Sequence, residues 1–183
     1  MNVETIRQAS EADAHAIARV HVAAWRETYA GLVPGEMIKR LDVRQRAERW
    51  RAILSAREAA TATFVACKGN GVIGFSSCGA QRDAGLVNLG FSGEISAIYI
   101  LQRMHRRGVG RRLMSAAASH LVSQDHAGAA LWVLSKNSLA RGFYERLKGE
   151  VAGERIDRRD AYSLREIAYG WRDLRELIVR SGA

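Results

Sequence analysis

The chain has 183 residues, of which 48% are hydrophobic and 26% charged, a composition that fits one folded domain and excludes a disordered segment. No apolar run is long enough to cross a bilayer and the charged N-terminus does not resemble a signal peptide, so we expect a cytoplasmic protein that contacts no membrane. The net charge of +9 fits an anionic partner. The two cysteines, Cys67 and Cys78, could face each other on neighbouring strands, but we expect them to be reduced thiols in the core.

The N-terminal third of the chain predicts one strand and three helices. Ser10, followed three residues later by Asp13, has the spacing of a capping box, and apolar residues then recur at helical intervals up to about Tyr29. The other elements expected here are a strand over Glu4–Gln8, a short helix that starts at Pro34 and a helix that starts at Asp42.

The rest of the chain predicts mainly strands. Apolar runs and turn residues indicate strands over 61–67, 72–78, 94–100, 129–134, 150–155 and 161–168, helices over 108–122, 139–147 and 173–179, and a loop over 79–92. The helix over 108–122 makes one β-α-β crossover, so the sheet is mixed, and the strands up to 94–100 can pair as antiparallel neighbours. We therefore expect an α/β (α+β) fold, a single domain over 1–183 with a mixed central sheet of about six to seven strands flanked by helices.

The segment from Glu94 to Leu121 has the pattern of a phosphate-binding site. An apolar strand runs into a basic loop that contains Gly108 and Gly110, and a helix follows. The first turn of a helix has backbone N–H groups without intrahelical partners and a partial positive charge, and glycines let an anion approach them. Five arginines add charge there: Arg103, Arg106, Arg107, Arg111 and Arg112.

Two other phosphate-binding motifs do not fit this segment. A dinucleotide-binding loop needs a third glycine where this chain has Leu113, and the chain has no G-K-S/T sequence of a Walker loop. The remaining alternative is that the two glycines only form a tight loop entering a helix, which the clustered arginines disfavour.

At this segment the chain resembles the GNAT acetyltransferase superfamily. The family pattern Q/R-x-x-G-x-G/A is matched by His105-Arg106-Arg107-Gly108-Val109-Gly110, with His105 in place of Gln or Arg. The block 131–147 resembles a second family pattern, N-x-x-A-x-x-F-Y-E/K-x-L, and Lys148 replaces the glycine that usually follows it. The resemblance spans nearly the whole chain and implies an acetyltransferase that uses acetyl-CoA. No spacing of His and Cys residues in the sequence indicates a metal site, so we expect no metal.

The resemblance implies where acetyl-CoA binds. Backbone groups of Ile98, Tyr99 and Ile100 would pair with the pantetheine, while their side chains are expected in the core. The pyrophosphate would meet the segment from Arg106 through Gly110, joined by Arg111, and His105 can donate a further hydrogen bond. Asn137 would hydrogen-bond the pantetheine arm or cap the helix that follows, and the two roles are compatible.

The resemblance also implies direct attack of an amine on the thioester, without a covalent enzyme intermediate. Tyr144 matches the general acid that protonates the departing thiolate, and the pKa of a phenol lies not far above that of a thiol. Glu94 stands where some family members carry a carboxylate base that acts through water. The simpler alternatives are that Tyr144 packs at an edge and that Glu94 is a surface residue.

The acceptor site is expected where relatives build it, in the loop over 25–37 and in a turn over 156–160. Trp25 and Tyr29 are candidates for an aromatic wall that attracts a protonated amine, although aromatic residues four apart on a helix commonly just pack. The nearby arginines indicate an acceptor with a carboxylate or phosphate, or are only a solvated charge run: Arg155, Arg158 and Arg159.

We therefore predict an N-acetyltransferase that moves an acetyl group from acetyl-CoA to a primary amine of a small molecule. The alternatives are a protein N-acetyltransferase acting on a lysine or an N-terminus, a degenerate member that binds acyl-CoA as a sensor, and a nucleic-acid binder, which the compact basic cluster makes unlikely. A homodimer is the general expectation for the oligomeric state.

Overall fold

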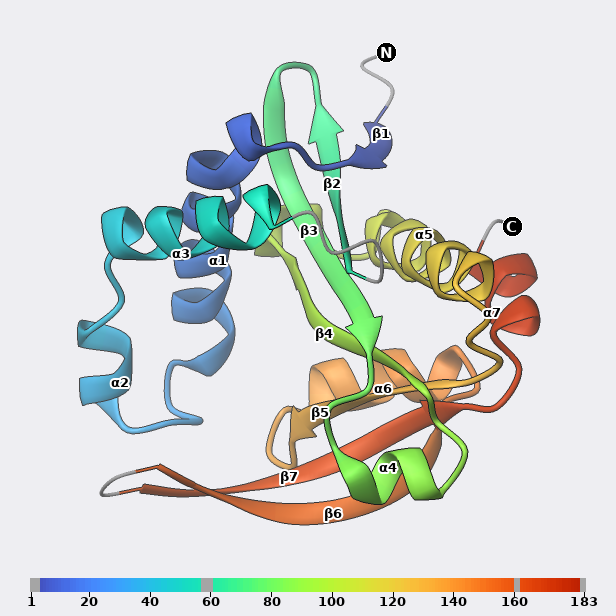
Figure 1. Cartoon of the computed structure of the whole chain (residues 1–183). Helices are drawn as coiled ribbons and strands as arrows, with labels where there is room; N and C mark the ends of the chain where they lie inside the picture. Colours follow the sequence, from blue (N-terminus) through green and yellow to red (C-terminus); the bar gives the residue numbers. More distant parts are fainter. Residues whose placement is uncertain (1–3, 57–60, 160–161, 182–183) are drawn as a thin grey trace.

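A computed structural model shows a central β-sheet with helices on both faces (Figure 1), and describes residues 4–56, 61–159 and 162–181. The strands are β1 (Glu4–Gln8), β2 (Ala62–Lys68), β3 (Gly71–Ala80), β4 (Gly93–Ile100), β5 (Ala129–Leu134), β6 (Glu150–Arg159) and β7 (Tyr162–Trp171). The helices are η1 (Glu11–Asp13), α1 (Ala14–Tyr29), α2 (Gly35–Lys39), α3 (Val43–Ser55), α4 (Ala84–Asn88), η2 (Gln102–Met104), α5 (Val109–Ser123), α6 (Ser138–Arg146) and α7 (Leu174–Ser181).

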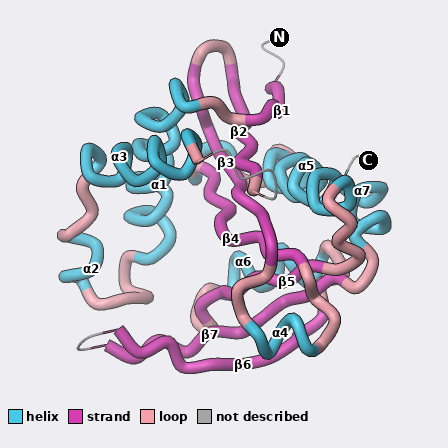
Figure 2. The backbone as a smooth tube through the Cα atoms, viewed as in Figure 1, coloured by secondary structure: helices cyan, strands magenta, loops and turns pink. Residues whose placement is uncertain are grey.

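The strands of the described part form one seven-stranded sheet in the order β1-β2-β3-β4-β5-β7-β6, which is strongly twisted from one edge to the other (Figure 2). β4 and β5 are parallel, and every other neighbouring pair is antiparallel. The expected mixed sheet, with antiparallel strands up to β4, is therefore confirmed. Within the described ranges, no helix has the length and apolarity needed to span a membrane.

Two hydrophobic cores hold the helices on the sheet. The first joins α1 and α3 to β2 and β3, with Ile17 and Phe75 fully buried in it. The second joins α5, α6 and α7 to β4, β5 and β7, around Tyr169. α5 belongs to both cores, because Leu113 packs in the first and Leu121 in the second. The N-terminus of α5 is therefore fixed relative to both halves of the sheet.

The predicted capping residues begin their helices. The backbone N–H of Ser10 donates to the Asp13 carboxylate at 2.8 Å, and that carboxylate also forms an ion pair with Arg7 of β1 at 2.7 Å. The Asp42 carboxylate accepts from the backbone N–H of Gln45 at 2.7 Å. Both predicted helix starts are confirmed. The ion pair of Asp13 with Arg7 also ties the edge strand β1 to the start of α1.

The predicted loop over 79–92 is wrong. β3 continues to Ala80, and α4 occupies part of the remaining segment. Asp83 caps α4 by accepting hydrogen bonds from two backbone N–H groups of its first turn. Phe91, just after α4, is 2% exposed and packs against β5 and β7. A helix this short has too few residues for its periodicity to be recognised in the sequence.

The predicted turn over 156–160 is also wrong. β6 continues to Arg159 and β7 begins at Tyr162, so the last hairpin is longer than expected. Asp160, and Ala161 at the expected start of the last strand, lie outside the described residues.

The two cysteines do not face each other. The register of β2 with β3 sets Cys67 opposite Val72 and Cys78 opposite Ala62, at different ends of the hairpin. Both are free and buried, and burial raises the pKa of the Cys78 thiol to about 12. They are therefore packing residues rather than nucleophiles.

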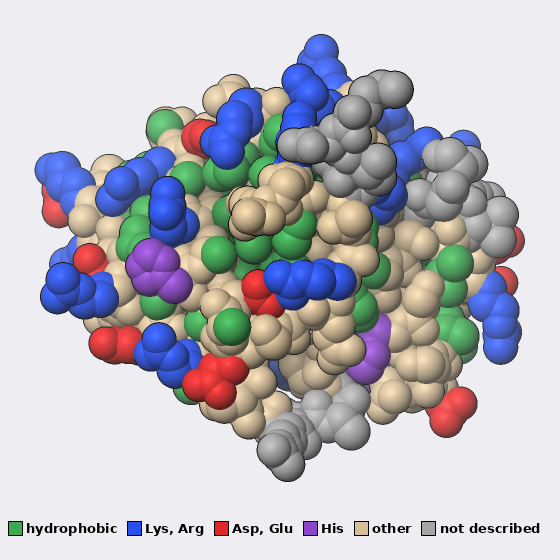
Figure 3. Space-filling view, turned by 90° about the horizontal axis from the view of Figure 1, so that it is seen from above, with side chains coloured by type: hydrophobic (Ala, Val, Ile, Leu, Met, Phe, Trp, Pro, Cys, Tyr) green, Lys and Arg blue, Asp and Glu red, His purple; other side chains and the backbone are tan. Residues whose placement is uncertain are grey.

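The positive charge is dispersed over the described side chains on the face seen in Figure 3. On the face seen in Figure 3, Lys and Arg side chains are spread over most of the outline, with Asp and Glu side chains among them. Some of the arginines in the described part pair with carboxylates, as Arg82 does with Glu94 and Arg155 with Glu166. This face carries no single large basic patch of the kind that follows a duplex.

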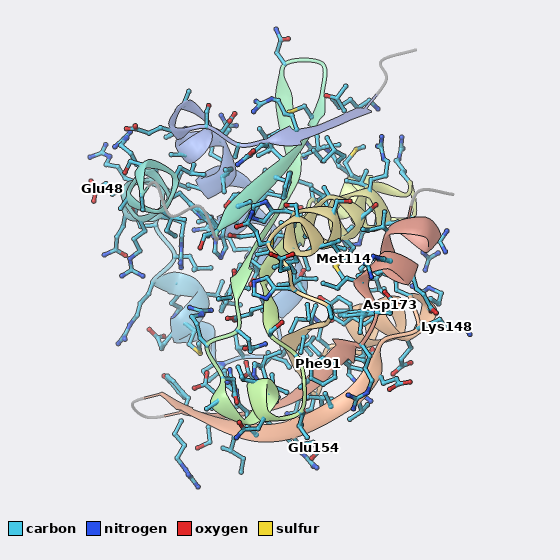
Figure 4. All side chains as sticks on the ribbon, turned by 45° about the vertical axis from the view of Figure 1, so that its right-hand side comes forward. Glu48, Phe91, Met114, Lys148, Glu154 and Asp173 are labelled. Carbon is cyan, nitrogen blue, oxygen red and sulfur yellow. The ribbon has the colours of Figure 1, made fainter. Side chains whose placement is uncertain are left out.

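Lys148 ends α6 in a conformation that suits glycine better. Its φ is 63°, in the left-handed region. The N–H of Lys148 donates to the carbonyl of Glu145 at 2.9 Å, and that of Gly149 to the carbonyl of Tyr144 at 2.9 Å, which satisfies the last carbonyls of the helix. The Lys148 side chain lies at the periphery of the molecule (Figure 4). In the left-handed region its Cβ is sterically unfavourable, and glycine, which has no Cβ, would avoid this cost.

Lys148→Gly should therefore raise the free energy of unfolding by about 1 kcal/mol, because the strain relieved exceeds the added entropy of the unfolded chain. Urea denaturation followed by circular dichroism measures the change. Asp125→Gly is the matched control: Asp125 also has φ 63°, but aspartate tolerates this region better, so a smaller gain is expected. A less stable Lys148→Gly variant would contradict the strain argument.

Candidate active site

The parallel strands β4 and β5 are paired only where they begin. Gly93 lies opposite Ala129 and Glu94 opposite Ala130, and these are their only paired positions in the described part of the chain. Beyond them, the facing edges of the two strands lack the hydrogen bonds of a parallel ladder. The side chains of β4 from Ser96 onward are exposed or half-buried, although β4 is the middle strand of the sheet. The sheet is therefore broken at its centre.

A β-bulge in β4 starts this break. Two residues of β3, Ser77 and Cys78, lie opposite the three residues Ile95–Ala97, so Ser96 is the extra residue. The Ser96 hydroxyl donates to the carbonyl of Ser77 at 3.2 Å. A bulge bends its strand and increases the local twist, which turns β4 away from β5 after its second residue.

The chain that follows β4 forms the predicted basic loop and enters α5. Gly108 is the N-cap residue, with φ 78°, and Arg106 also has a left-handed conformation, with φ 59°. The His105 Nε2 lies 3.0 Å from the carbonyl oxygen of Ile100, so its ring turns back toward the end of β4. Arg107 and Arg111, both exposed, lie next to the start of α5 in the chain, where the first N–H groups of the helix have no intrahelical partner.

Gly110 packs the loop against α6. A Cβ at Gly110 would lie 3.0 Å from Cζ of Phe143 and 3.2 Å from Cδ1 of Ile100. A Cβ at Gly108 would meet nothing within 4 Å, so only the positive φ requires glycine there. The second glycine is needed for close packing and the first for the turn of the backbone.

Asn137 and Tyr144 come from α6 and the residue before it. The Asn137 Oδ1 accepts from the backbone N–H of Ala140 at 3.1 Å, so Asn137 caps α6, one of its two expected roles. Tyr144 is 6% exposed, and its ring lies 5.7 Å from that of Tyr169 and 6.0 Å from that of Trp171. Burial, together with the nearby Tyr99, raises the pKa of Tyr144, so its phenol is protonated at neutral pH.

An aromatic group lies between α1 and β4. The Trp25 Nε1–H donates to the Tyr99 hydroxyl at 3.0 Å, and the ring centres of Trp25 and Tyr29 are 4.5 Å apart. His21 stacks on Tyr99, with ring centres 4.7 Å apart and planes at 21°. The Tyr99 ring packs against the first core, with its centre 5.5 Å from that of Phe75, but it is only half-buried and its hydroxyl has a polar partner.

Three phenols from separate elements lie near one another. Burial raises the pKa of Tyr29, and the nearby hydroxyls of Tyr99 and Tyr144 and the carboxylate of Glu166 raise it further. The structure thus brings the predicted residues Tyr29, of α1, and Tyr144, of α6, together around β4.

Glu94 lies at the opposite end of β4 from the glycine loop. Arg82 donates to both of its oxygens, each at 2.7 Å. The Glu94 side chain is 12% exposed, whereas that of Arg82 is 77% exposed, so Arg82 covers the carboxylate from the solvent side. Glu94 is a covered and paired carboxylate rather than a free surface one.

Arg155 is engaged by other protein groups. It lies on β6, its Nε donates to Glu166 at 2.8 Å and its Nη1 to Asp83 at 3.3 Å, and its guanidinium lies 4.2 Å from the ring centre of Trp132. Arg158 is exposed on the same strand, and the side chain of Arg159 lies outside the described residues. The expected group of free arginines in a turn is therefore not formed by Arg155.

His21 and the hydroxyl of Tyr99 are the groups that the sequence analysis missed. Tyr99 is the one aromatic residue of an otherwise aliphatic strand, which is a usable signal for a polar tip at an open edge. His21 has no such signal, because its partner Trp50 is far away in the sequence. Among the described residues, no group of three His, Cys, Asp or Glu side chains is placed to hold a metal ion.

Known proteins resemble this chain along nearly its whole length. The model of the acetyltransferase (GNAT) family matches residues 17–149. The uncharacterized N-acetyltransferase YuaI of Bacillus subtilis is 31% identical over 94% of this chain and 95% of its own. Two similar solved structures are each 18% identical to this chain. PaiA N-acetyltransferase from Thermoplasma acidophilum, in complex with coenzyme A, has a TM-score of 0.67 over 92% of this chain and 99% of its own. The structure of yncA from Salmonella typhimurium, with acetyl-CoA, has a TM-score of 0.68 over 93% of this chain and 94% of its own.

His21 makes the aromatic group sensitive to acid. It is 8% exposed, and its Nδ1 accepts from the Trp50 Nε1–H at 3.1 Å, which requires the neutral ring because both nitrogens of a protonated imidazole are donors. Burial, with a smaller effect of the nearby Arg46, lowers the pKa of His21 to about 3. Between the ordinary histidine pKa and this value, the unfolded chain binds one more proton than the folded chain, so stability falls as the pH falls.

The free energy of unfolding should therefore drop by about 2 kcal/mol from about pH 8 to about pH 5 through His21 alone. Denaturation of the wild type and of His21→Gln, which keeps an acceptor but does not titrate, measures this difference. The exposed His15, on the same helix, gives the control variant His15→Gln, which should keep the wild-type slope. An unchanged slope in His21→Gln would show that the pKa of His21 is the same in the folded and the unfolded chain.

Proposed function

The chain belongs to the acetyltransferase (GNAT) family and is an acetyltransferase, and we propose that it transfers the acetyl group of acetyl-CoA to a primary amine of a small molecule. The observation that carries this proposal is the break between β4 and β5, which leads to the N-terminus of α5. An unpaired strand edge can bind the amides of a pantetheine arm, and a helix N-terminus can bind its pyrophosphate. Two structures of this fold hold coenzyme A or acetyl-CoA.

The residues present fit this coenzyme. The backbone of Ile98, Tyr99 and Ile100 would bind the pantetheine, since this part of β4 has no partner strand on the β5 side. The segment Arg106–Arg111 would bind the pyrophosphate with its backbone N–H groups and exposed guanidinium groups. His105 would act by holding the end of β4, because its imidazole is already engaged with Ile100.

Tyr144 is the proposed general acid. When bound, the coenzyme supplies an activated acyl group and a thiolate leaving group. The raised pKa of Tyr144 keeps its proton available at neutral pH, and its burial keeps competing water away from the phenol.

Glu94 is the proposed base, acting through water on the protonated amine. Each of its oxygens accepts one hydrogen bond from Arg82 and keeps a further lone pair for a water molecule. Arg82 would then act as a positioning residue, because it fixes the orientation of the carboxylate.

A small amine is favoured by the aromatic group at the acceptor side. Trp25 contacts both Tyr29 and Tyr99, and the two tyrosines are near enough to Tyr144 to enter into the raised pKa values of this group. An aromatic group of this kind suits a compact acceptor better than an extended peptide. The alternative is a protein substrate: a ribosomal-protein-alanine N-acetyltransferase from Brucella melitensis has this fold (TM-score 0.69), but at 19% identity the likeness shows the fold alone. Thiol release from acetyl-CoA with a panel of small amines and a panel of peptides tests the choice.

Gly108→Val should weaken the binding of acetyl-CoA by at least about tenfold, because a β-branched residue at φ 78° distorts the turn and its side chain enters the anion site. Titration calorimetry measures the affinity. Gly31→Val is the matched control: Gly31 has φ 79°, a Cβ there would also meet nothing within 4 Å, and the residue lies outside the phosphate-binding loop. The control should lose similar stability and keep its affinity, and equal affinities in all three proteins would contradict the placement of the pyrophosphate.

Tyr144→Phe should lower kcat by at least about a hundredfold while the Kd of acetyl-CoA stays nearly unchanged, because only the proton donor is removed. Steady-state kinetics with an accepted amine, together with calorimetry, separates the two effects. Tyr169→Phe removes a neighbouring hydroxyl that is bound to Glu145 and serves as the control. A Tyr144→Phe variant with the wild-type rate would exclude Tyr144 as the acid.

A further inference from the structure

Arg46 is directed toward α1 from the inner side of α3. It precedes Trp50 by four residues, and this spacing puts both side chains on one face of the helix. Trp50 faces α1, where its indole N–H donates to His21 at 3.1 Å. Glu48, on the other side of α3, lies at the outer edge of the molecule in Figure 4.

The charge of Arg46 is half-buried, and no carboxylate of the described residues pairs with it. Within the described ranges, its guanidinium forms no ion pair or hydrogen bond, whereas Arg7, Arg82 and Arg155 each lie against a carboxylate. Burial lowers the pKa of Arg46, and the neighbouring Arg49 lowers it further. Removing a cation from water beside a second cation is unfavourable unless an anion compensates.

Arg46 also borders the acceptor side of the candidate site. Arg46 shares a face of α3 with Trp50, whose indole N–H donates to His21, and His21 stacks on Tyr99. The charge of Arg46 also lowers the pKa of His21, as a cation near these rings would. The hydroxyl of Tyr99 is hydrogen-bonded to Trp25. The uncompensated cation and the aromatic group proposed to receive the acceptor are therefore neighbours.

We propose that Arg46 binds a carboxylate of the acceptor, so that the preferred acceptor is an amino acid or a similar amine with a carboxylate, rather than a simple amine. This inference rests on the proposed acetyl transfer. A guanidinium binds a carboxylate through two parallel hydrogen bonds, and Arg46 has its donors unused by described protein groups. Arg155, which the sequence analysis considered for such a role, already has two carboxylate partners.

Product-like ligands test the site without turnover. The ¹⁵N-labelled protein, saturated with coenzyme A, is titrated with N-acetylglycine and with its neutral counterpart N-acetylglycinamide. The chain has four tryptophans, so the indole N–H signal of Trp25 can be assigned by comparison with Trp25→Phe. N-acetylglycine should shift this signal saturably, and the amide should bind at least about tenfold more weakly. Equal affinities, or no binding of N-acetylglycine at high millimolar concentration, would overturn the proposal.

Two arginines of α3 provide the variants. Arg46→Gln should lose at least about tenfold in affinity for N-acetylglycine and none for the amide. Arg44, exposed on the same helix, gives the control Arg44→Gln, which should bind both probes as the wild type does. Since none of the described residues pairs with Arg46, Arg46→Gln should unfold at the same or a higher temperature. Unchanged binding, or a marked loss of thermal stability that makes Arg46 a structural residue, would contradict the assignment.

Turnover separates this inference from the proposed function. Thiol release from acetyl-CoA is compared for amino acids and their carboxamides. If N-acetylglycine binds through Arg46 but no amine is acetylated, the carboxylate site stands and the proposed transfer fails. If amines are acetylated and the carboxylate gives no advantage in kcat/KM, the transfer stands and this inference is overturned.

Discussion

The bulge at Ser96 is the feature on which the candidate site depends. Backbone N–H and C=O groups in the middle of a sheet normally bond to the next strand, and the extra residue bends β4 so that this is possible with β5 at only two positions. The backbone N–H and C=O groups of β4 that face β5 beyond these two positions need another partner. The other parts of the site meet this strand: the glycine loop follows its end, Glu94 lies near its start, and the Trp25 indole of α1 donates to the Tyr99 hydroxyl. The Phe143 ring of α6 lies close to Gly110 of the loop.

Much of the fold could be predicted because its elements are long and their patterns regular. The helix starts at Ser10 and Asp42, the hairpin of β2 and β3 and the crossover through α5 all follow from local capping, turn and periodicity signals. The missed helix α4 and the length of the last hairpin depend on tertiary packing instead. Phe91 is buried by strands that come much later in the chain, and no local pattern announces this.

The candidate site was predictable where a motif is contiguous. The loop from His105 to Gly110 and the segment from Asn137 to Tyr144 are each read within a few residues, and the structure brings them to the same break in the sheet. The partners that act across the fold were not predictable: Arg82 on Glu94, Trp25 on the Tyr99 hydroxyl, and Arg46 beside His21. Such pairs depend on the packing of two helices or on the register of a strand, which a single sequence does not reveal.

The close contact of Gly110 with Phe143 has a consequence for how this enzyme can evolve. Position 110 belongs to the phosphate loop, and position 143 precedes the proposed acid on α6, so the two parts meet through one pair of residues of complementary size. An alanine at 110 would fit only if the Phe143 ring and the Ile100 side chain moved away by a few tenths of an ångström. The side chains tolerated at position 110 should therefore depend on those at 143 and 100, so that the phosphate loop and α6 constrain each other in the lineage of this protein.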